Sequence, residues 1–215
     1  KLPVPPDALK LWRLLENIKD PFDKEIISTL MHVGLWWMLR SREYLSNSKR
    51  KMDNDGALCW GDVSFMAAGD ELQNTPILEG QGITQKIKLS LLSTKNSYGR
   101  CTRTLYARHD DPLCPVVMLC KLYVAWTQKL GQPPPADQHL CMLSSGAFFT
   151  RGEMSSELQN TMVECGLPKS LMAGHSIRRG GCCLWHATGK ISDNYLKAWG
   201  RWESDAFLDY VFCYE

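Results

Sequence analysis

Several features that would assign this chain to a familiar class are missing from its sequence. No two cysteines form a Cys-x-x-Cys pair, although the 215 residues include 9 cysteines. The ligand spacing typical of zinc fingers and zinc ribbons is therefore absent. No apolar run approaches the length of a membrane span, and neither internal repeats nor low-complexity segments occur. We therefore expect one domain with an ordinary core, no membrane segment, no metal and no cofactor.

The cysteines themselves indicate an intracellular protein. Their number is odd, and we expect no secretory leader, because the sequence shows none. Several lie in apolar runs, such as Cys120 and the adjacent pair Cys182 and Cys183. Reduced, buried thiols inside a cell are the expected state. A zinc or redox protein that uses Cys165, Cys182, Cys183 and His186 is an alternative, but this spacing fits no common site.

The net charge of +2 does not by itself indicate a nucleic-acid-binding protein. The basic residues are nevertheless clustered, at residues 49–51, between residues 100 and 108, and at residues 178–179. A nearly neutral total can therefore conceal a basic face.

The apolar spacing predicts an α+β fold that is mostly α. Helices are expected over residues 8–18, 23–38, 112–130, 155–165, 175–187, 192–199 and 205–212. Strands are expected over residues 59–65, 84–92 and 101–106. The last two strands flank turn residues and predict a β-hairpin with Lys95 at its tip, within a small antiparallel sheet.

The segment from Gly174 to Gly181 contains the chemically most suggestive pair. His175 and Arg178 are three residues apart, so on a helix they share a face. That face combines a titratable imidazole with a permanently charged guanidinium. One His-x-x-Arg pattern is a weak signal, since such residues are also common on solvated helix faces.

With further residues in order along the chain, the pattern resembles the tyrosine recombinases, the family of phage integrases. The motifs are Leu39-Arg40-Ser41-Arg42-Glu43, then Ser93-Thr94-Lys95-Asn96, His175-Ser176-Ile177-Arg178, Gly200-Arg201-Trp202 and Tyr210. The Gly-Arg-Trp form is most similar to recombinases of eukaryotic DIRS and crypton-type mobile elements. The resemblance implies a recombinase catalytic domain over residues 1–215, with a helical core and a small sheet that carries the lysine hairpin.

The resemblance also implies the chemistry. Arg40 and Arg178 would bind the non-bridging oxygens of a DNA phosphodiester, which makes a metal unnecessary. Tyr210 would be the nucleophile and would form a covalent 3′-phosphotyrosyl link. A free tyrosine has a pKa of about 10 and needs help in losing its proton, for which His175 is the expected base or positioning group. Lys95 would protonate the departing 5′ oxygen.

Trp202 would pack against the phosphate, but the alignment leaves an alternative here. Arg201 is nine residues before Tyr210, where many relatives carry a histidine, and Trp202 is eight residues before it. We choose Trp202 as catalytic and Arg201 as a DNA contact.

Nearby residues of the same type compete with three of the chosen positions. Arg42 competes with Arg40, and the spacing of three residues before Glu43 favours Arg40, which could also simply pair with Glu43. Tyr214 competes with Tyr210 as the nucleophile. Lys86 and Lys88 are poorer candidates than Lys95, because they lie within a strand.

The resemblance implies double-stranded DNA as the partner and a homotetramer on paired sites. The expected DNA contacts are Arg42, Lys49, Arg50, Arg179 and Arg201. The N-terminal DNA-clamping domain of the family has no counterpart in these residues. Two competing functions are a catalytically inactive DNA-binding remnant of a mobile-element recombinase, and a type IB topoisomerase, which uses the same chemistry. The expected location is intracellular, and nuclear in a eukaryote.

Overall fold

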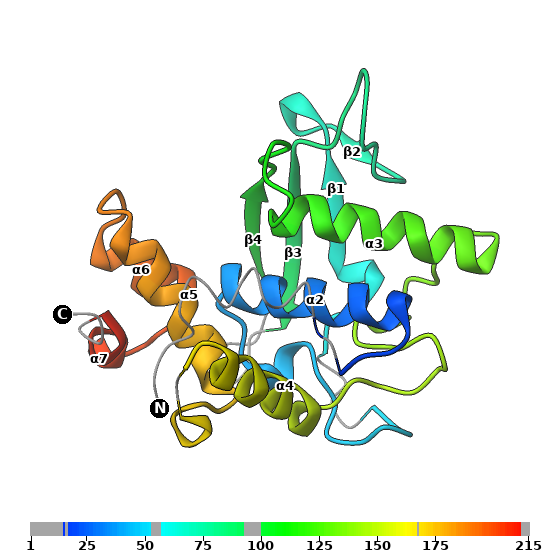
Figure 1. The fold of residues 1–215 in the computed structure, drawn as a ribbon. Helices are drawn as coiled ribbons and strands as arrows, with labels where there is room; N and C mark the ends of the chain where they lie inside the picture. Colours follow the sequence, from blue (N-terminus) through cyan, green and yellow to red (C-terminus); the bar gives the residue numbers. More distant parts are fainter. Residues whose placement is uncertain (1–14, 16, 53–56, 93–99, 167, 212–215) are drawn as a thin grey trace.

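The computed structural model describes residue 15 and residues 17–52, 57–92, 100–166 and 168–211. In these ranges the chain forms six α-helices and one four-stranded sheet (Figure 1). The helices are α2 (Pro21–Trp36), α3 (Pro115–Leu130), α4 (Arg151–Glu164), α5 (His175–Ala187), α6 (Asp193–Gly200) and α7 (Leu208–Val211). The strands are β1 (Val63–Met66), β2 (Leu72–Gln73), β3 (Lys86–Leu92) and β4 (Arg100–Tyr106). The prediction of a mostly helical α+β fold is confirmed.

The sheet is antiparallel throughout, with strand order β2-β1-β3-β4. Strand β3 pairs with β4 from Lys86 opposite Tyr106 to Leu92 opposite Arg100. The apolar residues of β3 alternate as the sequence predicts, and Ile87, Leu89 and Leu91 are buried. The two predicted strands of the hairpin are therefore confirmed. Its tip, including Lys95, lies outside the described residues.

Helix α2 is the central helix of the core. Asp20 caps it by accepting hydrogen bonds from the N–H groups of Phe22 and Asp23, so the helix begins at Pro21 and not at the predicted Asp23. It ends at Trp36, two residues before the prediction, because Met38 has a left-handed backbone with φ 49°. Its middle residues are buried on all sides, as the sequence indicates for a helix covered by its neighbours.

Two further helices pack on α2. Helix α3 runs beside it and in front of the sheet (Figure 1). It ends at Gly131, whose φ of 71° favours glycine. Helix α5 crosses α2 so closely that a Cβ on Gly181 would lie 2.1 Å from the carbonyl oxygen of Leu35. This close crossing brings the beginning of α5 next to the chain that leaves α2.

Some predicted boundaries are wrong. Helix α4 begins at Arg151 and not at Ser155, because Thr150 and Glu153 form a capping box upstream of the two serines. The predicted strand over residues 59–65 is a 3₁₀ turn at Trp60–Asp62 followed by β1. Strand β2 was not predicted, and two residues are too short for a periodic pattern.

The two ends of the described chain also differ from the prediction. Of the helix expected over residues 8–18, most lies outside the described residues, and residues 15, 17 and 18 are not helical. The helix expected over residues 205–212 is divided into a 3₁₀ turn at Asp205–Phe207 and α7. Within the described ranges, no helix has both the length and the apolar composition needed to cross a membrane.

Candidate active site

The first part of the site is the turn after α2. Glu43 ends a 3₁₀ turn at Ser41–Glu43, and its carboxylate accepts hydrogen bonds from the backbone N–H of Arg40 at 2.7 Å and from the Arg40 Nη1 at 3.2 Å. The Glu43 side chain is 3% exposed and that of Arg40 is 33% exposed. This ion pair was the competing explanation for an arginine at position 40. The pair is present, and it leaves the Arg40 guanidinium partly open to solvent.

The second part is the first turn of α5. His175 is exposed at the beginning of the helix, whereas Arg178, on the next turn, is 4% exposed. Arg178 donates from Nη1 to the carbonyl of Met38 at 2.6 Å and from Nη2 to the carbonyl of Gly200. Burial lowers the pKa of Arg178 to about 9, and the positive charges of Arg40 and Arg201 add to this effect. The guanidinium remains charged at neutral pH.

The third part is the Gly200-Arg201-Trp202 segment after α6. Arg201 has a left-handed backbone with φ 59° and turns the chain back toward the end of α2. Its Nη2 donates to the Glu43 carboxylate at 2.8 Å and to the carbonyl of Met38 at 3.3 Å. Arg40, Arg178 and Arg201 thus gather near the single carboxylate of Glu43, and we call these four residues the guanidinium cluster.

Trp202 forms the outer wall of the guanidinium cluster. Its ring lies over the Arg178 guanidinium, with 4.4 Å from the Arg178 Cζ to the ring centroid. A Cβ on Gly200 would collide with this ring, so glycine provides the room for it to fold back. Spacing made Arg201 and Trp202 competitors for one position, and the fold brings both against the other arginines.

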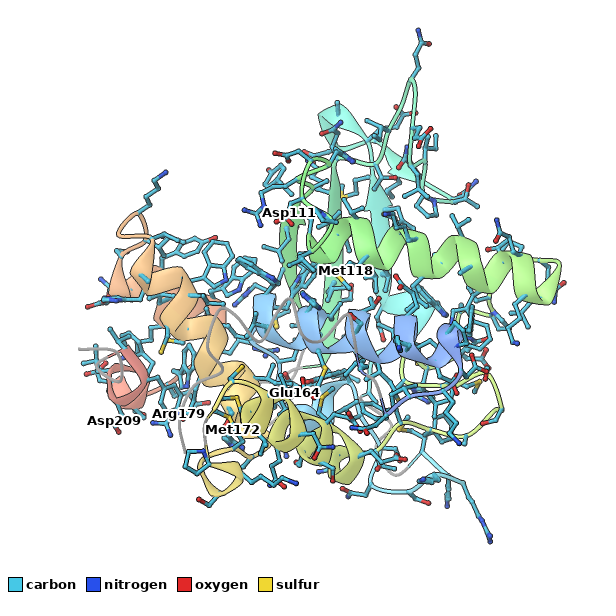
Figure 2. All side chains as sticks on the ribbon, viewed as in Figure 1. Asp111, Met118, Glu164, Met172, Arg179 and Asp209 are labelled. Atoms are coloured by element: carbon cyan, nitrogen blue, oxygen red, sulfur yellow. The ribbon has the colours of Figure 1, made fainter. Side chains whose placement is uncertain are left out.

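Tyr210, on α7, lies beside the Trp202 ring. Its half-buried ring lies edge-on to that of Trp202, with centroids 5.8 Å apart. The Arg179 guanidinium lies over the same ring, 4.5 Å from its centroid. Arg179 also donates to the carbonyl of Asp209 at 3.3 Å, and Figure 2 labels both residues where α5 and α7 meet. The competing residue Tyr214 lies outside the described residues.

The remaining predicted residues lie elsewhere or outside the described ranges. Lys49 and Arg50 are exposed in the loop after residue 46, where Lys49 pairs with Glu153 at 2.7 Å. Arg42 is half-buried in the turn that carries Arg40. Lys95 falls in residues 93–99, outside the described part. Lys86 lies at the opposite end of β3 from that segment and pairs with Asp70.

The geometry around the thiols gives no support for a metal site. Cys182 and Cys183 are buried in α5, and His186 faces Asp193 at 3.8 Å. Among the described residues, no group of three or more His, Cys, Asp or Glu side chains could hold a metal ion.

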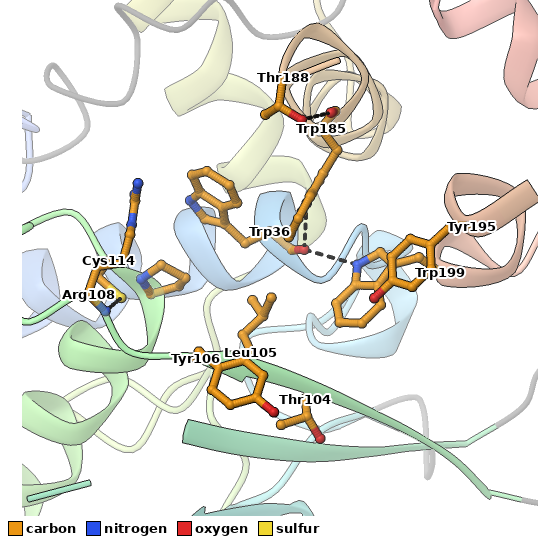
Figure 3. Close-up of a pocket in the computed structure, with 11 residues that line it drawn as sticks. Trp36, Thr104, Leu105, Tyr106, Arg108, Cys114, Trp185, Thr188, Tyr195 and Trp199 are labelled. Carbon is orange, nitrogen blue, oxygen red and sulfur yellow. Dashed lines mark hydrogen bonds between the residues drawn. The ribbon is translucent and has the colours of Figure 1, made fainter. Parts of the chain in front are cut away.

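A separate pocket of about 400 Å³ opens between the end of α2, β4, α5 and α6 (Figure 3). Indoles form much of its wall: Trp36, Trp185 and Trp199. The carbonyl of Trp36 accepts hydrogen bonds from the Nε1 atoms of Trp185, at 3.3 Å, and Trp199, at 3.2 Å. The described residues that line the pocket include none from the guanidinium cluster, so the pocket lies beside the site and is not part of it.

Comparison with known proteins supports the fold assignment. No family model and no curated protein matches the chain. A solved structure, the XerH site-specific recombinase bound to its difH substrate in a pre-cleavage complex, matches over 98% of this chain with a TM-score of 0.60. The identity is 13%, and the chain spans about half the length of that protein, 50%. The fold of this chain is therefore similar to a part of a site-specific recombinase.

Proposed function

We propose that this chain is the catalytic domain of a site-specific DNA recombinase that cuts and rejoins DNA through Tyr210. The observation that carries the proposal is the guanidinium cluster beside a tyrosine. Two guanidiniums bond to one buried carboxylate and a third lies close enough to interact with it, which leaves a net positive charge next to the phenol. A phosphodiester is the natural ligand for such a charge. The similarity in fold to a recombinase that was solved with its DNA substrate supports the same conclusion.

In this proposal, the arginines stabilise the extra negative charge of the pentacoordinate phosphorus. Arg40 is open enough to contact a phosphate in the free protein, since a third of its side chain is exposed. Arg178 uses two of its five N–H groups on backbone carbonyls, so three remain for phosphate oxygens. The Trp202 ring covers the Arg178 guanidinium, so a phosphate would reach Arg178 only after this ring shifts.

Tyr210 would attack the phosphorus, and the bond to the 5′ oxygen would break. The Arg178 charge lies close enough to interact with the phenol, and it would stabilise the negative charge on the attacking oxygen. His175 would accept or orient the phenolic proton, and Lys95 would protonate the leaving 5′ oxygen. The product is a 3′-phosphotyrosyl link, and reversal with another 5′ hydroxyl rejoins the strand.

The proposed DNA contacts outside the cluster are Arg42, Lys49, Arg50 and Arg179, together with Arg201 within it. The proposed assembly is a homotetramer on two paired sites. The origin in a DIRS or crypton-type mobile element and a nuclear location belong to the same proposal, and they rest on the Gly200-Arg201-Trp202 form.

The test is capture of the covalent intermediate. The purified chain is incubated with a library of nicked duplexes whose sequence is randomised around the nick, so that the cut fragment is lost and the adduct persists. We expect a DNA-linked species that survives denaturing electrophoresis, with the nucleotide on Tyr210 by mass spectrometry. Tyr210→Phe should abolish this species, whereas Tyr195→Phe, an exposed tyrosine on α6, should retain it. An adduct that persists in Tyr210→Phe but is lost in Tyr214→Phe would transfer the role to Tyr214.

A second candidate function is a DNA-binding remnant without cleavage activity. The observation in its favour is the burial of Arg178, which is 4% exposed beneath Trp202 and bonded to two backbone carbonyls. This function predicts binding to duplex DNA that weakens steeply with salt, with no adduct on any member of the library.

A further inference from the structure

A thiol and an imidazole face each other where the chain before β1 meets the loop between α3 and α4. Cys59 and His139 are opposite residues of an antiparallel bridge. The Cys59 Sγ lies 3.2 Å from the His139 Nδ1, and both side chains are half-buried. The ring of Phe148 packs edge-on against the imidazole, with centroids 5.9 Å apart, and limits its movement. No sequence pattern connects the thiol to the imidazole, since the two residues are 80 positions apart.

The backbone carbonyl of Ala57 faces both members of the pair. Its oxygen accepts a hydrogen bond from the Cys59 Sγ at 3.5 Å and lies 3.3 Å from the His139 Nδ1. When the thiol proton passes to the imidazole, the hydrogen on Nδ1 can be shared between this carbonyl and the sulfur. The sulfur then only accepts. An N–H donor on sulfur, and still more an imidazolium, stabilises the thiolate over the thiol.

A carboxylate fixes the backbone at Cys59. The Asp62 side chain accepts a hydrogen bond from the backbone N–H of Cys59 at 3.1 Å. This bond helps to hold the thiol opposite His139. A thiolate–imidazolium pair formed there carries no net charge of its own.

We propose that Cys59 is a peroxide-reactive thiol activated by His139. The Cys59 thiolate attacks one oxygen of hydrogen peroxide, so that an S–O bond forms and the O–O bond breaks. The departing hydroxide takes the proton of the His139 imidazolium and leaves as water. The sulfur is oxidised to a sulfenic acid, the peroxide is reduced, and the imidazole ends neutral.

The other cysteines provide a contrast within the same molecule. Burial raises the pKa of Cys120 and of Cys182 to about 12, so both remain protonated and inert at neutral pH. Cys101 on β4 is half-buried like Cys59, and it therefore serves as a comparator of similar access.

The position of Cys59 links it to the guanidinium cluster. The preceding residue, Leu58, donates its N–H to the carbonyl of Glu43 at 2.9 Å. An oxidised Cys59 would therefore lie one residue from the backbone that supports the shared carboxylate. The thiol chemistry itself is independent of the proposed DNA reaction and is tested without DNA.

The experiment compares labelling rates of individual cysteines between about pH 5.5 and pH 9. Iodoacetamide is used in one series, and hydrogen peroxide with dimedone in the other, with peptide mass spectrometry as the readout. A free thiol is only a few per cent thiolate at pH 7, so we expect Cys59 to react about tenfold faster than Cys101 at that pH. As the pH is raised, the reaction rate of Cys59 should stop increasing before about pH 8, whereas the rate of Cys101 should keep increasing.

A pair of histidine variants separates activation from access. His139→Gln should slow Cys59 about tenfold at pH 7, whereas His109→Gln, which alters an exposed histidine elsewhere, should leave the rate unchanged. The proposal is overturned if Cys59 and Cys101 react within about twofold of each other and their rates rise in parallel up to pH 9. This comparison is made on the unaltered protein, so it decides the question even if His139→Gln does not fold.

Discussion

Replacement of Glu43 by glutamine tests whether one carboxylate holds the site together. The side chain keeps its size but loses its charge, and its amide NH₂ would face a guanidinium. Glu43 is 3% exposed, and it accepts from Arg201 at 2.8 Å, from the Arg40 guanidinium at 3.2 Å and from the Arg40 backbone at 2.7 Å. Hydrogen bonds to a charged group contribute roughly 1.5–3 kcal/mol each, and partly exposed ion pairs contribute less than about 1 kcal/mol.

The magnitude follows from the exposure of each partner. The Arg201 side chain is 13% exposed, so its bond should have nearly full value, whereas Arg40 is 33% exposed and contributes less. We expect Glu43→Gln to lower the free energy of unfolding by about 3 kcal/mol. For a chain of this length, that corresponds to a decrease of about 6–12 °C in Tm.

The assay is urea unfolding followed by circular dichroism, with Glu71→Gln as an exposed control that should change stability by less than about 0.5 kcal/mol. A double-mutant cycle with Arg201→Gln isolates the pair, and we expect a coupling energy of at least about 1.5 kcal/mol. If Glu43→Gln behaves like Glu71→Gln, or if the coupling is zero, Glu43 does not organise the cluster and the reasoning fails.

Two further predictions concern the scaffold. Gly181→Ala places a Cβ 2.1 Å from the carbonyl oxygen of Leu35 and should destabilise the protein by about 2–3 kcal/mol, because a backbone atom cannot rotate away. Gly152→Ala, in the open first turn of α4, is the control. Equal urea midpoints for the two variants would contradict the close crossing of α2 and α5. Burial alone would raise the pKa of Glu153, but hydrogen bonds from Lys49 and Thr150 lower it below 4.5. On acidification, the Glu153 carboxylate is therefore protonated in the unfolded chain before it is protonated in the folded protein. Its contribution to the free energy of unfolding is complete above about pH 4.5 and is lost as the pH falls through the pKa of the folded protein. Stability of Glu153→Gln should accordingly change less between about pH 5 and pH 3 than that of the wild type, and equal slopes would contradict this.

The periodic elements were predictable because their pattern is local. Helix α5 begins and ends where the sequence predicts. Helix α3 ends at Leu130 as predicted, because the next residue, Gly131, has the left-handed backbone that favours glycine. The alternation in β3 likewise predicted its buried face. Two predictions failed because the local pattern was too short or ambiguous. Strand β2 has only two residues and was not predicted. The start of α4 was placed at the serines at 155 and 156, but Thr150 caps the helix instead.

The contacts of the site were less predictable, because they join distant segments through backbone atoms. The order of Arg40, Arg178 and Tyr210 suggested that they meet, and the fold places them near one another. The carbonyls of Met38 and Gly200, which hold Arg178, carry no signal in the sequence. Glu43 was visible as a partner of Arg40, but its bond to Arg201 spans 158 positions and requires the crossing of α5 and α2.

The Gly200-Arg201-Trp202 segment explains why the choice between Arg201 and Trp202 could not be made from spacing. The left-handed backbone at Arg201 reverses the chain within one residue, at a cost of about 1 kcal/mol for a residue with a Cβ. Arg201 then points to Glu43, while Trp202 folds back across Gly200 onto Arg178. Counting residues from Tyr210 assumes that only one of two neighbours can face the site. A tight reversal removes that assumption, because Arg201 and Trp202 both reach the guanidinium cluster, the first at Glu43 and the second at Arg178.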